Sequence, residues 1–216
     1  MSESPDFTIE CRRCPRLASF LDDVRVRYQH YHARPVPAFG DPNPRLLIVG
    51  LAPGMHGANA SGRPFTGDHA GILLYKTLFE YGFSSHADAV AAGQDLVLTD
   101  CRITNAVKCL PPQNKPLGSE VITCNGYLRS ELAQLKRGAL ILALGGLAHS
   151  AVLRALDLKV GGHKFGHGVS RALNEGRWLI SSYHCSRYNT QTRRLTPEMF
   201  TAVFAQIRKL MTHECT

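Results

Sequence analysis

The chain has 216 residues, 44% of them apolar and 19% charged, which excludes a disordered or collagen-like protein and is sufficient for a globular core. Lys and Arg number 25 against 17 Asp and Glu, so the net charge is +8 and a polyanion is the favoured class of partner. The positive charges are scattered, which excludes a basic tail. No repeat or shift in composition marks a boundary, so we predict one domain spanning residues 1–216.

The chain shows no sign of export or membrane insertion. Its first twenty residues contain three acidic side chains and no continuous apolar run, so no signal peptide is predicted. The longest apolar stretch, Gly138 to Ala148, is shorter than the ~18 residues that a membrane span needs. We therefore expect a soluble, intracellular protein that does not contact a membrane.

Apolar runs and helical patterns alternate along the chain. An outer helix is predicted at residues 15–32, and strands are predicted at residues 46–49, 96–99 with 103–107 close behind, 139–144 and 178–182. The helices predicted between and after the strands have apolar faces within residues 72–79, 119–135, 147–156 and 196–210. Strands without polar alternation, separated by helices, predict an α/β fold with a parallel sheet covered on both faces. Ligands of such sheets bind at the carboxyl ends of the strands, which here are Val49, Val107, Leu144 and Ser182.

Four cysteines form two candidate pairs. Cys11 and Cys14 make a C-x2-C motif, and Cys109 and Cys124 are separated by 14 residues. The pairs can meet if the N-terminal helix folds back over the edge of the sheet. Four thiolates would then suit zinc or an iron–sulfur cluster.

Two alternatives to this ligand set remain open. A zinc site could combine the C-x2-C motif with His30 and His32, although these histidines are closer together than the usual spacing of about three to five residues. The mid-chain cysteines could also be ordinary core thiols. Cys101, Cys185 and Cys215 have no comparable partner and are expected to be free thiols.

A loop with six glycines, residues 50–71, follows the first apolar run. It has neither the G-x-G-x-x-G nor the P-loop pattern, so it does not indicate a phosphate cradle. Glycines allow a backbone to approach a flat ligand closely, and Phe65 offers a face for stacking. The alternative is a crossover loop with Phe65 in the core.

A second chemically rich loop, residues 181–195, follows the last apolar run. It places His184 at the carboxyl end of a strand, followed by Arg187, Arg193 and Arg194. This position favours a ligand-binding histidine, although a lone histidine is more often structural. The arginines are candidate phosphate contacts, and a solvated basic surface is the alternative for each.

Three segments, GLAPGMHGANASGRPFTGD, KCLPPQNKP and SYHCSRYNTQTRRLT, resemble motifs of the uracil-DNA glycosylase superfamily, in particular its iron–sulfur family 5. The resemblance extends from Cys11 to the last helix. It implies a three-layer αβα sandwich with a central four-stranded parallel sheet. It also implies a 4Fe–4S cluster on Cys11, Cys14, Cys109 and Cys124, in preference to zinc.

The same resemblance implies a monofunctional glycosylase that flips uracil, and other deaminated bases such as hypoxanthine, out of DNA and excises them. Phe65 would stack on the base, Asp68 would orient water, and His184 would donate to the departing base. Backbone groups would line one wall of the pocket, at Gly50, Leu51, Ala52, Pro53 and Gly54. We expect a monomer in the prokaryotic cytoplasm, associated with the nucleoid.

Two further residues have counterparts in the related families. Asn105 coincides with an asparagine that family 4 uses near the base, and Asn114 matches a polar position of family 5 and would hold the water or the base edge. Lys115 is a further candidate phosphate contact, with a solvated basic surface as the alternative. The related family 4 has GEAPG where this chain has GLAPG, so Leu51 cannot supply a carboxylate and Asp68 takes that role. No lysine is placed by motif to form a Schiff base.

Two other functions remain as alternatives. One is a non-catalytic iron–sulfur protein that binds nucleic acid, with Leu51 marking a lost active site. The other is a redox protein, which is disfavoured by the lack of a flavin or nicotinamide fingerprint.

Overall fold

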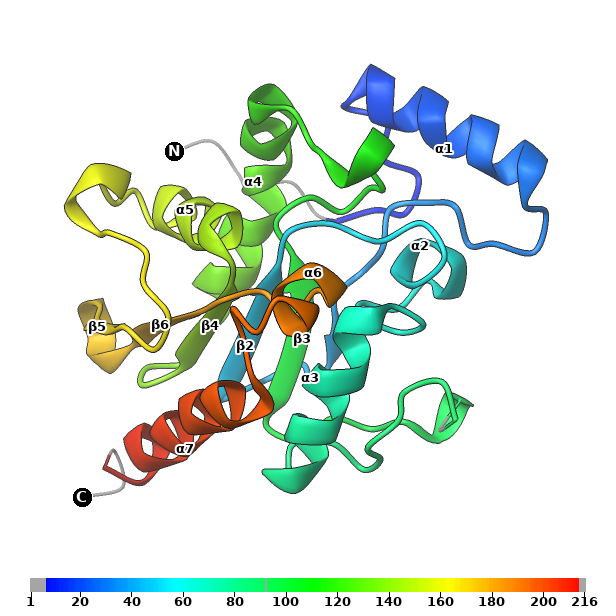
Figure 1. Cartoon of the computed structure of the whole chain (residues 1–216). Helices are drawn as coiled ribbons and strands as arrows, with labels where there is room; N and C mark the ends of the chain where they lie inside the picture. The colour runs from blue at the N-terminus through cyan, green and yellow to red at the C-terminus, as the bar shows by residue number, and fades with distance from the viewer. Residues whose placement is uncertain (1–6, 92, 214–216) are drawn as a thin grey trace.

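A twisted sheet of six strands crosses the middle of the computed structural model, which describes residues 7–91 and 93–213 (Figure 1). The strand order is β1-β3-β2-β4-β6-β5, and the strands are β1 (Phe39–Gly40), β2 (Leu46–Gly50), β3 (Cys101–Asn105), β4 (Leu140–Leu144), β5 (Ser170–Ala172) and β6 (Trp178–Ser182). The four inner strands pair in parallel, and β1 and β5 pair antiparallel at the two edges. The mixed sheet is therefore wider than the four strands expected. The edge strands have two and three residues, too few to form a recognisable apolar run.

The predicted strands are confirmed at β2, β4 and β6, but only in part at β3. Residues 96–99 do not join the sheet, and Leu98 instead forms an isolated bridge with Ser84. Leu96 and Leu98 are nevertheless buried, so their apolar character reflects anchoring of a loop in the core rather than a strand.

Seven α-helices are present in the described residues: α1 (Pro15–Arg27), α2 (Ala58–Ser61), α3 (His69–Glu80), α4 (Gly118–Ala133), α5 (Gly146–Ala155), α6 (Arg187–Gln191) and α7 (Pro197–His213). Short 3-10 turns lie at Gly93–Asp95, Pro112–Asn114, Val160–Gly162 and Asn174–Gly176. The prediction that the first helix reaches residue 32 is wrong, because the backbone leaves the helical region at Tyr28 (φ −129°, ψ 77°). None of the described helices is both long and apolar enough to cross a membrane.

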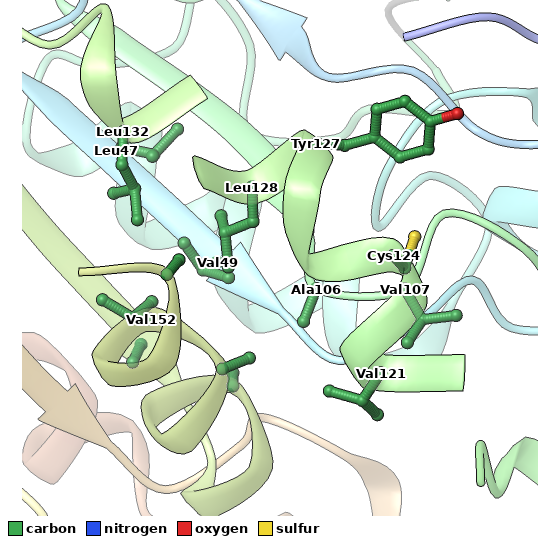
Figure 2. Close-up of a cluster of buried hydrophobic side chains, with 14 of the residues drawn as sticks. Leu47, Val49, Ala106, Val107, Val121, Cys124, Tyr127, Leu128, Leu132 and Val152 are labelled. Carbon is green, nitrogen blue, oxygen red and sulfur yellow. The ribbon is translucent and has the colours of Figure 1, made fainter. Parts of the chain in front are cut away.

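The helices cover both faces of the sheet, so the arrangement has three layers (Figure 1). Alternate residues of β2 point to opposite faces: Leu47 and Val49 join a core with α1, α4 and α5, whereas Leu46 and Ile48 join a core with α3 and α7. Figure 2 shows the first core, in which Val49 faces Leu128 of α4.

Candidate active site

A cavity of about 450 Å³ opens at the carboxyl ends of the parallel strands. All four predicted ligand loops contribute to its lining, which comprises Leu51, Ala52, Gly54, Ala58, Phe65, Asp68, His69, Ala70, Asn105, Asn114, Leu144, Gly145, Gly146, Leu147, Ala148, His184, Ser186 and Arg187. Carboxyl ends of neighbouring parallel strands meet at one edge, which is why segments distant in sequence converge here.

Phe65 belongs both to the core and to the cavity wall. Its side chain is 5% exposed, its backbone has φ +57°, and it lines the cavity. Gly50 does not line the cavity, but a Cβ at this position would collide with Asn105 and would lie 2.8 Å from the Phe65 ring. The first glycine of the loop therefore makes room for the aromatic wall, and both interpretations of Phe65 are compatible with the geometry.

The carboxylate of Asp68 is held by backbone. It precedes α3 and accepts a hydrogen bond from the Ala58 N–H, 3.1 Å from Oδ2. Side chains at Gly54 or Gly57 would collide with this carboxylate. Burial raises the pKa of Asp68, and N–H donation from Ala58 and Gly54 partly offsets that rise by stabilising the charged form. The loop glycines thus surround an acid at the cavity wall.

The imidazole of His184 lies against Phe65, with ring centroids 5.8 Å apart and planes inclined by 28°. Its position is fixed from the backbone, because its carbonyl accepts a hydrogen bond of 2.8 Å from Asn189 Nδ2. Burial lowers the pKa of His184 to about 4. The ring is therefore neutral at physiological pH and carries one N–H donor.

Two asparagines complete the polar part of the lining. Asn105, at the end of β3, is 3% exposed, and within the described part of the chain its Oδ1 has no hydrogen-bond partner. A buried acceptor without a partner carries a free-energy cost, which a ligand with an N–H group would relieve. Asn114 is exposed in a turn with φ +57° and lines the cavity from its mouth.

Within the predicted wall, Leu51, Ala52 and Gly54 line the cavity, whereas Gly50 and the buried Pro53 do not. The sequence interpretation missed His69, whose Nε2 lies 3.2 Å from Thr190 Oγ1 and so links α3 to α6. It also missed Ser186, the N-cap of α6, which accepts a hydrogen bond from the Asn189 N–H. The sequence did contain a signal for both residues, because His69 directly follows Asp68 and Ser186 lies two residues after His184.

The four candidate phosphate-binding residues are all exposed, but only Arg187 lines the cavity. The Arg194 guanidinium lies over the Tyr183 ring, 4.8 Å from its centroid. Arg193 sits at the end of the α6 turn with φ +57°. Lys115 accepts, at its carbonyl, a hydrogen bond of 3.2 Å from Arg16.

The two predicted cysteine pairs meet in one core. Cys109 and Cys124 are buried among apolar residues, and Cys11 and Cys14, beside the start of α1, pack against the same cluster. Burial, followed by the negative charge that Cys124 and the two N-terminal cysteines would carry, raises the pKa of Cys109. Burial also raises the pKa of Cys124 to about 11. The N-terminal segment does therefore fold back towards α4.

Hydrogen-bond donors point at two of these sulfurs. The Lys108 N–H donates to Cys124 Sγ over 3.3 Å, and the Tyr127 hydroxyl donates to Cys11 Sγ over 3.2 Å. Tyr127 extends from α4 away from the centre of the core (Figure 2). Over the described ranges, no group of three His, Cys, Asp or Glu side chains lies close enough to hold a single metal ion, and this applies both to the four cysteines and to the alternative set with His30 and His32. Cys101 and Cys185 are buried free thiols, and Cys215 lies outside the described residues.

Comparison with known proteins gives consistent matches. The family model described as the uracil DNA glycosylase superfamily matches residues 37–208. A protein named type-5 uracil-DNA glycosylase from Thermus thermophilus is 45% identical over 205 residues, covering 93% of each chain. One of the same name from Pyrobaculum aerophilum is 42% identical, covering 90% of this chain and 86% of its own. A type-4 uracil-DNA glycosylase from Archaeoglobus fulgidus is 30% identical, covering 70% of this chain and 62% of its own.

Proposed function

The chain belongs to the uracil DNA glycosylase superfamily and to its type-5 group, and from this premise we propose that it excises uracil from DNA by hydrolysing the N-glycosidic bond. The observation that carries the proposal is the convergence of Phe65, Asp68, Asn105 and His184 on one cavity. This activity would begin base excision repair by leaving an abasic site.

The cavity suits a base that has left the duplex. A base inside the helix is inaccessible, so the nucleotide must be flipped out into a pocket. The buried ring of Phe65 supplies an apolar wall, and the Asn105 Oδ1 supplies an acceptor for an N–H on the edge of uracil. Stacking fixes the plane of the base, and the amide selects its polar edge.

His184 acts on the departing base. As the glycosidic bond breaks, its electron pair goes to the base, which becomes an anion. A neutral imidazole stays uncharged before the reaction and donates its N–H to a base oxygen as the negative charge develops. Loss of one such donor typically costs ~2.7–4 kcal/mol of transition-state stabilisation.

Asp68 acts on the sugar and the water. Its carboxylate is held beside the cavity by the Ala58 N–H, where negative charge stabilises the positive charge that develops on deoxyribose. Water adds its oxygen to the sugar carbon, and its proton leaves by way of the carboxylate. Asn114, at the cavity mouth, is the second candidate for holding this water.

We propose two finer features of the activity. The enzyme is monofunctional, because no lysine is placed by motif to form a Schiff base with the sugar. The volume of about 450 Å³ leaves room for a larger base than uracil, which supports hypoxanthine as a further substrate. We propose that the enzyme acts on DNA as a monomer.

We also propose a 4Fe–4S cluster on Cys11, Cys14, Cys109 and Cys124. The donor set fits such a cluster: four thiols share one largely apolar core, and two of their sulfurs receive hydrogen bonds. When bound, the cluster would cross-link the start of α1 to α4 and to the segment after β3.

A base-release assay tests the activity. The protein would be incubated in excess with duplex and single-stranded DNA carrying uracil, hypoxanthine or mismatched thymine, and abasic sites would be revealed by alkaline scission. We expect scission at uracil, strongly reduced in Asp68→Asn. Tight binding without release at any base would instead favour the non-catalytic binding protein, and strand cleavage before alkali treatment would contradict a monofunctional enzyme.

A further inference from the structure

A second cavity, of about 490 Å³, adjoins the first. The two share Phe65, Asp68, His69 and Arg187, which form the ridge between them. We call the second cavity the flanking groove. A chain molecule with two neighbouring units, such as two successive nucleotides, could therefore place one unit in each cavity.

Two exposed apolar side chains belong to the lining of the flanking groove. Ile72, on the first turn of α3, is 67% exposed, and Val90, in the segment between α3 and β3, is 63% exposed. Cationic groups, Lys76 and Arg187, stand in the same lining. Apolar walls with positive groups beside them match a nucleotide, which has a flat base and an anionic phosphate.

The groove is already shaped without a ligand. Arg63 donates hydrogen bonds of 2.7 Å to the carbonyls of Ala89 and Gly93, so the outer wall is fixed to the turn that carries Phe65. The Asp88 carboxylate accepts the N–H groups of Val90 and Ala91 at 2.8 and 3.1 Å. These hydrogen bonds fix the turn that carries Val90, and the Asp88 carboxylate keeps its negative charge, so the phosphate is expected on the side of Lys76 and Arg187.

We infer that the flanking groove receives the base of the nucleotide next to the flipped one, on the same DNA strand. The inference rests on the proposed function, because the first cavity must hold the flipped base. The groove continues directly from that cavity, and its volume lies within the range of small-molecule sites, about 300–1,000 Å³. Contact with Ile72 and Val90 would replace the stacking that this base loses when its neighbour leaves the helix.

Binding to short single strands tests the inference without requiring catalysis. The probes would carry a central 2′-fluoro-deoxyuridine, which resists cleavage, with a spacer lacking the base at the 5′ or the 3′ neighbour. We expect about tenfold weaker binding with the spacer on one side, measured by fluorescence anisotropy, and little change on the other.

Variants connect this spacer penalty to the groove. Ile72→Ser combined with Val90→Ser should abolish the penalty. Ile122→Ser is the matched control, because Ile122 is equally exposed, at 64%, on α4, which covers the other face of the sheet. It should keep the penalty in full. Thermal unfolding would verify that all variants fold.

Two results with these probes would overturn the inference: equal binding of all the probes by the wild type, and a full spacer penalty in the double variant. A duplex probe with the spacer opposite uracil tests the complementary strand. A penalty that arises only with this probe would place the unpaired base of the complementary strand in the groove and would also overturn the inference. If uracil is never released but the spacer penalty is present and sensitive to the variants, the proposed function fails while the groove assignment stands.

Discussion

The cavity and the cysteine core hold their reactive groups in different ways. In the cavity, Asp68 is surrounded by loop glycines, and two backbone N–H groups fix its carboxylate and offset part of the rise in pKa that burial causes. In the cysteine core, Cys109 and Cys124 lie among apolar side chains that disfavour a thiolate. Groups of the chain itself thus hold the Asp68 carboxylate in place, whereas the buried thiols need a cationic partner to become charged.

The largest expected effect concerns the cysteine core. Cys124→Ser should abolish bound iron and labile sulfide, because a hydroxyl is a poor replacement for a thiolate ligand. Cys101→Ser is the matched control: Cys101 is also fully buried, but it lies in the other core, and this variant should keep its iron. Metal and sulfide analysis after anaerobic purification measures the difference. A colourless wild-type protein with one zinc per chain would contradict the cluster.

The next largest effect concerns the cavity. His184→Ala should slow single-turnover release of uracil about 100- to 1,000-fold, equivalent to ~2.7–4 kcal/mol, through loss of one preorganised donor. Affinity for DNA should change little, because the interaction forms in the transition state. Equal losses in rate and affinity would show that His184 only binds substrate.

Asp68→Asn separates the two roles within the cavity. Under the proposed mechanism Asp68 acts on the sugar and the water, which uracil and hypoxanthine substrates share, so its loss should slow release of both bases by similar factors. Loss of His184 should change the ranking of the two bases, since they present different acceptors. Single-turnover rates on both substrates distinguish these patterns. If Asp68→Asn releases both bases at the wild-type rate, the role of holding the water would be assigned to Asn114 instead.

The apolar periodicity of the sequence predicted the inner sheet and the covering helices, because burial on both faces leaves continuous apolar runs. It could not predict β1 and β5, which depend on pairing with neighbours rather than on their own composition. It also placed Ile72 on a buried face, although this side chain lines a groove and is exposed. An exposed apolar side chain next to buried ones therefore produces the same sequence pattern as a face that is buried throughout.

Motifs predicted nine of the 18 residues that line the cavity, because these residues are close to one another in sequence within each loop. They could not separate Leu51, which lines the cavity, from Pro53, which is buried behind it. That distinction depends on the path of the backbone. Nor could they reveal the link between His69 and Thr190, two residues 121 positions apart.

A smaller effect concerns stability against pH. The folded-state pKa of His184, about 4, lies below the ~6.5 of an unfolded histidine, so the unfolded chain takes up a proton first as pH falls. The contribution of His184 to the free energy of unfolding is therefore complete above pH 6.5 and is lost as the pH falls towards 4. Between pH 7 and pH 5 the loss should be about 2 kcal/mol.

Urea unfolding of wild type and His184→Gln at pH 7 and pH 5 measures that loss as a difference between the two proteins. The raised pKa of Asp68 acts in the opposite direction, stabilising the fold as pH falls, but it is common to both proteins and cancels. Identical pH dependence in the two proteins would show that His184 is not buried in its neutral form.

The smallest effect concerns the basic loop after His184. Each phosphate neutralised by a cation releases counterions, so the logarithm of DNA affinity falls with the logarithm of salt concentration by ~0.9 per contact on duplex DNA. Arg187→Ala should lower the slope by about one, because Arg187 stands at the cavity. Arg194→Ala should lower it less if the guanidinium stays over Tyr183, where it supports the segment preceding His184. Arg193→Ala, which removes an exposed cation without that contact, is the comparison. Equal slopes for the wild type and all three variants would show that these arginines do not contact DNA phosphates.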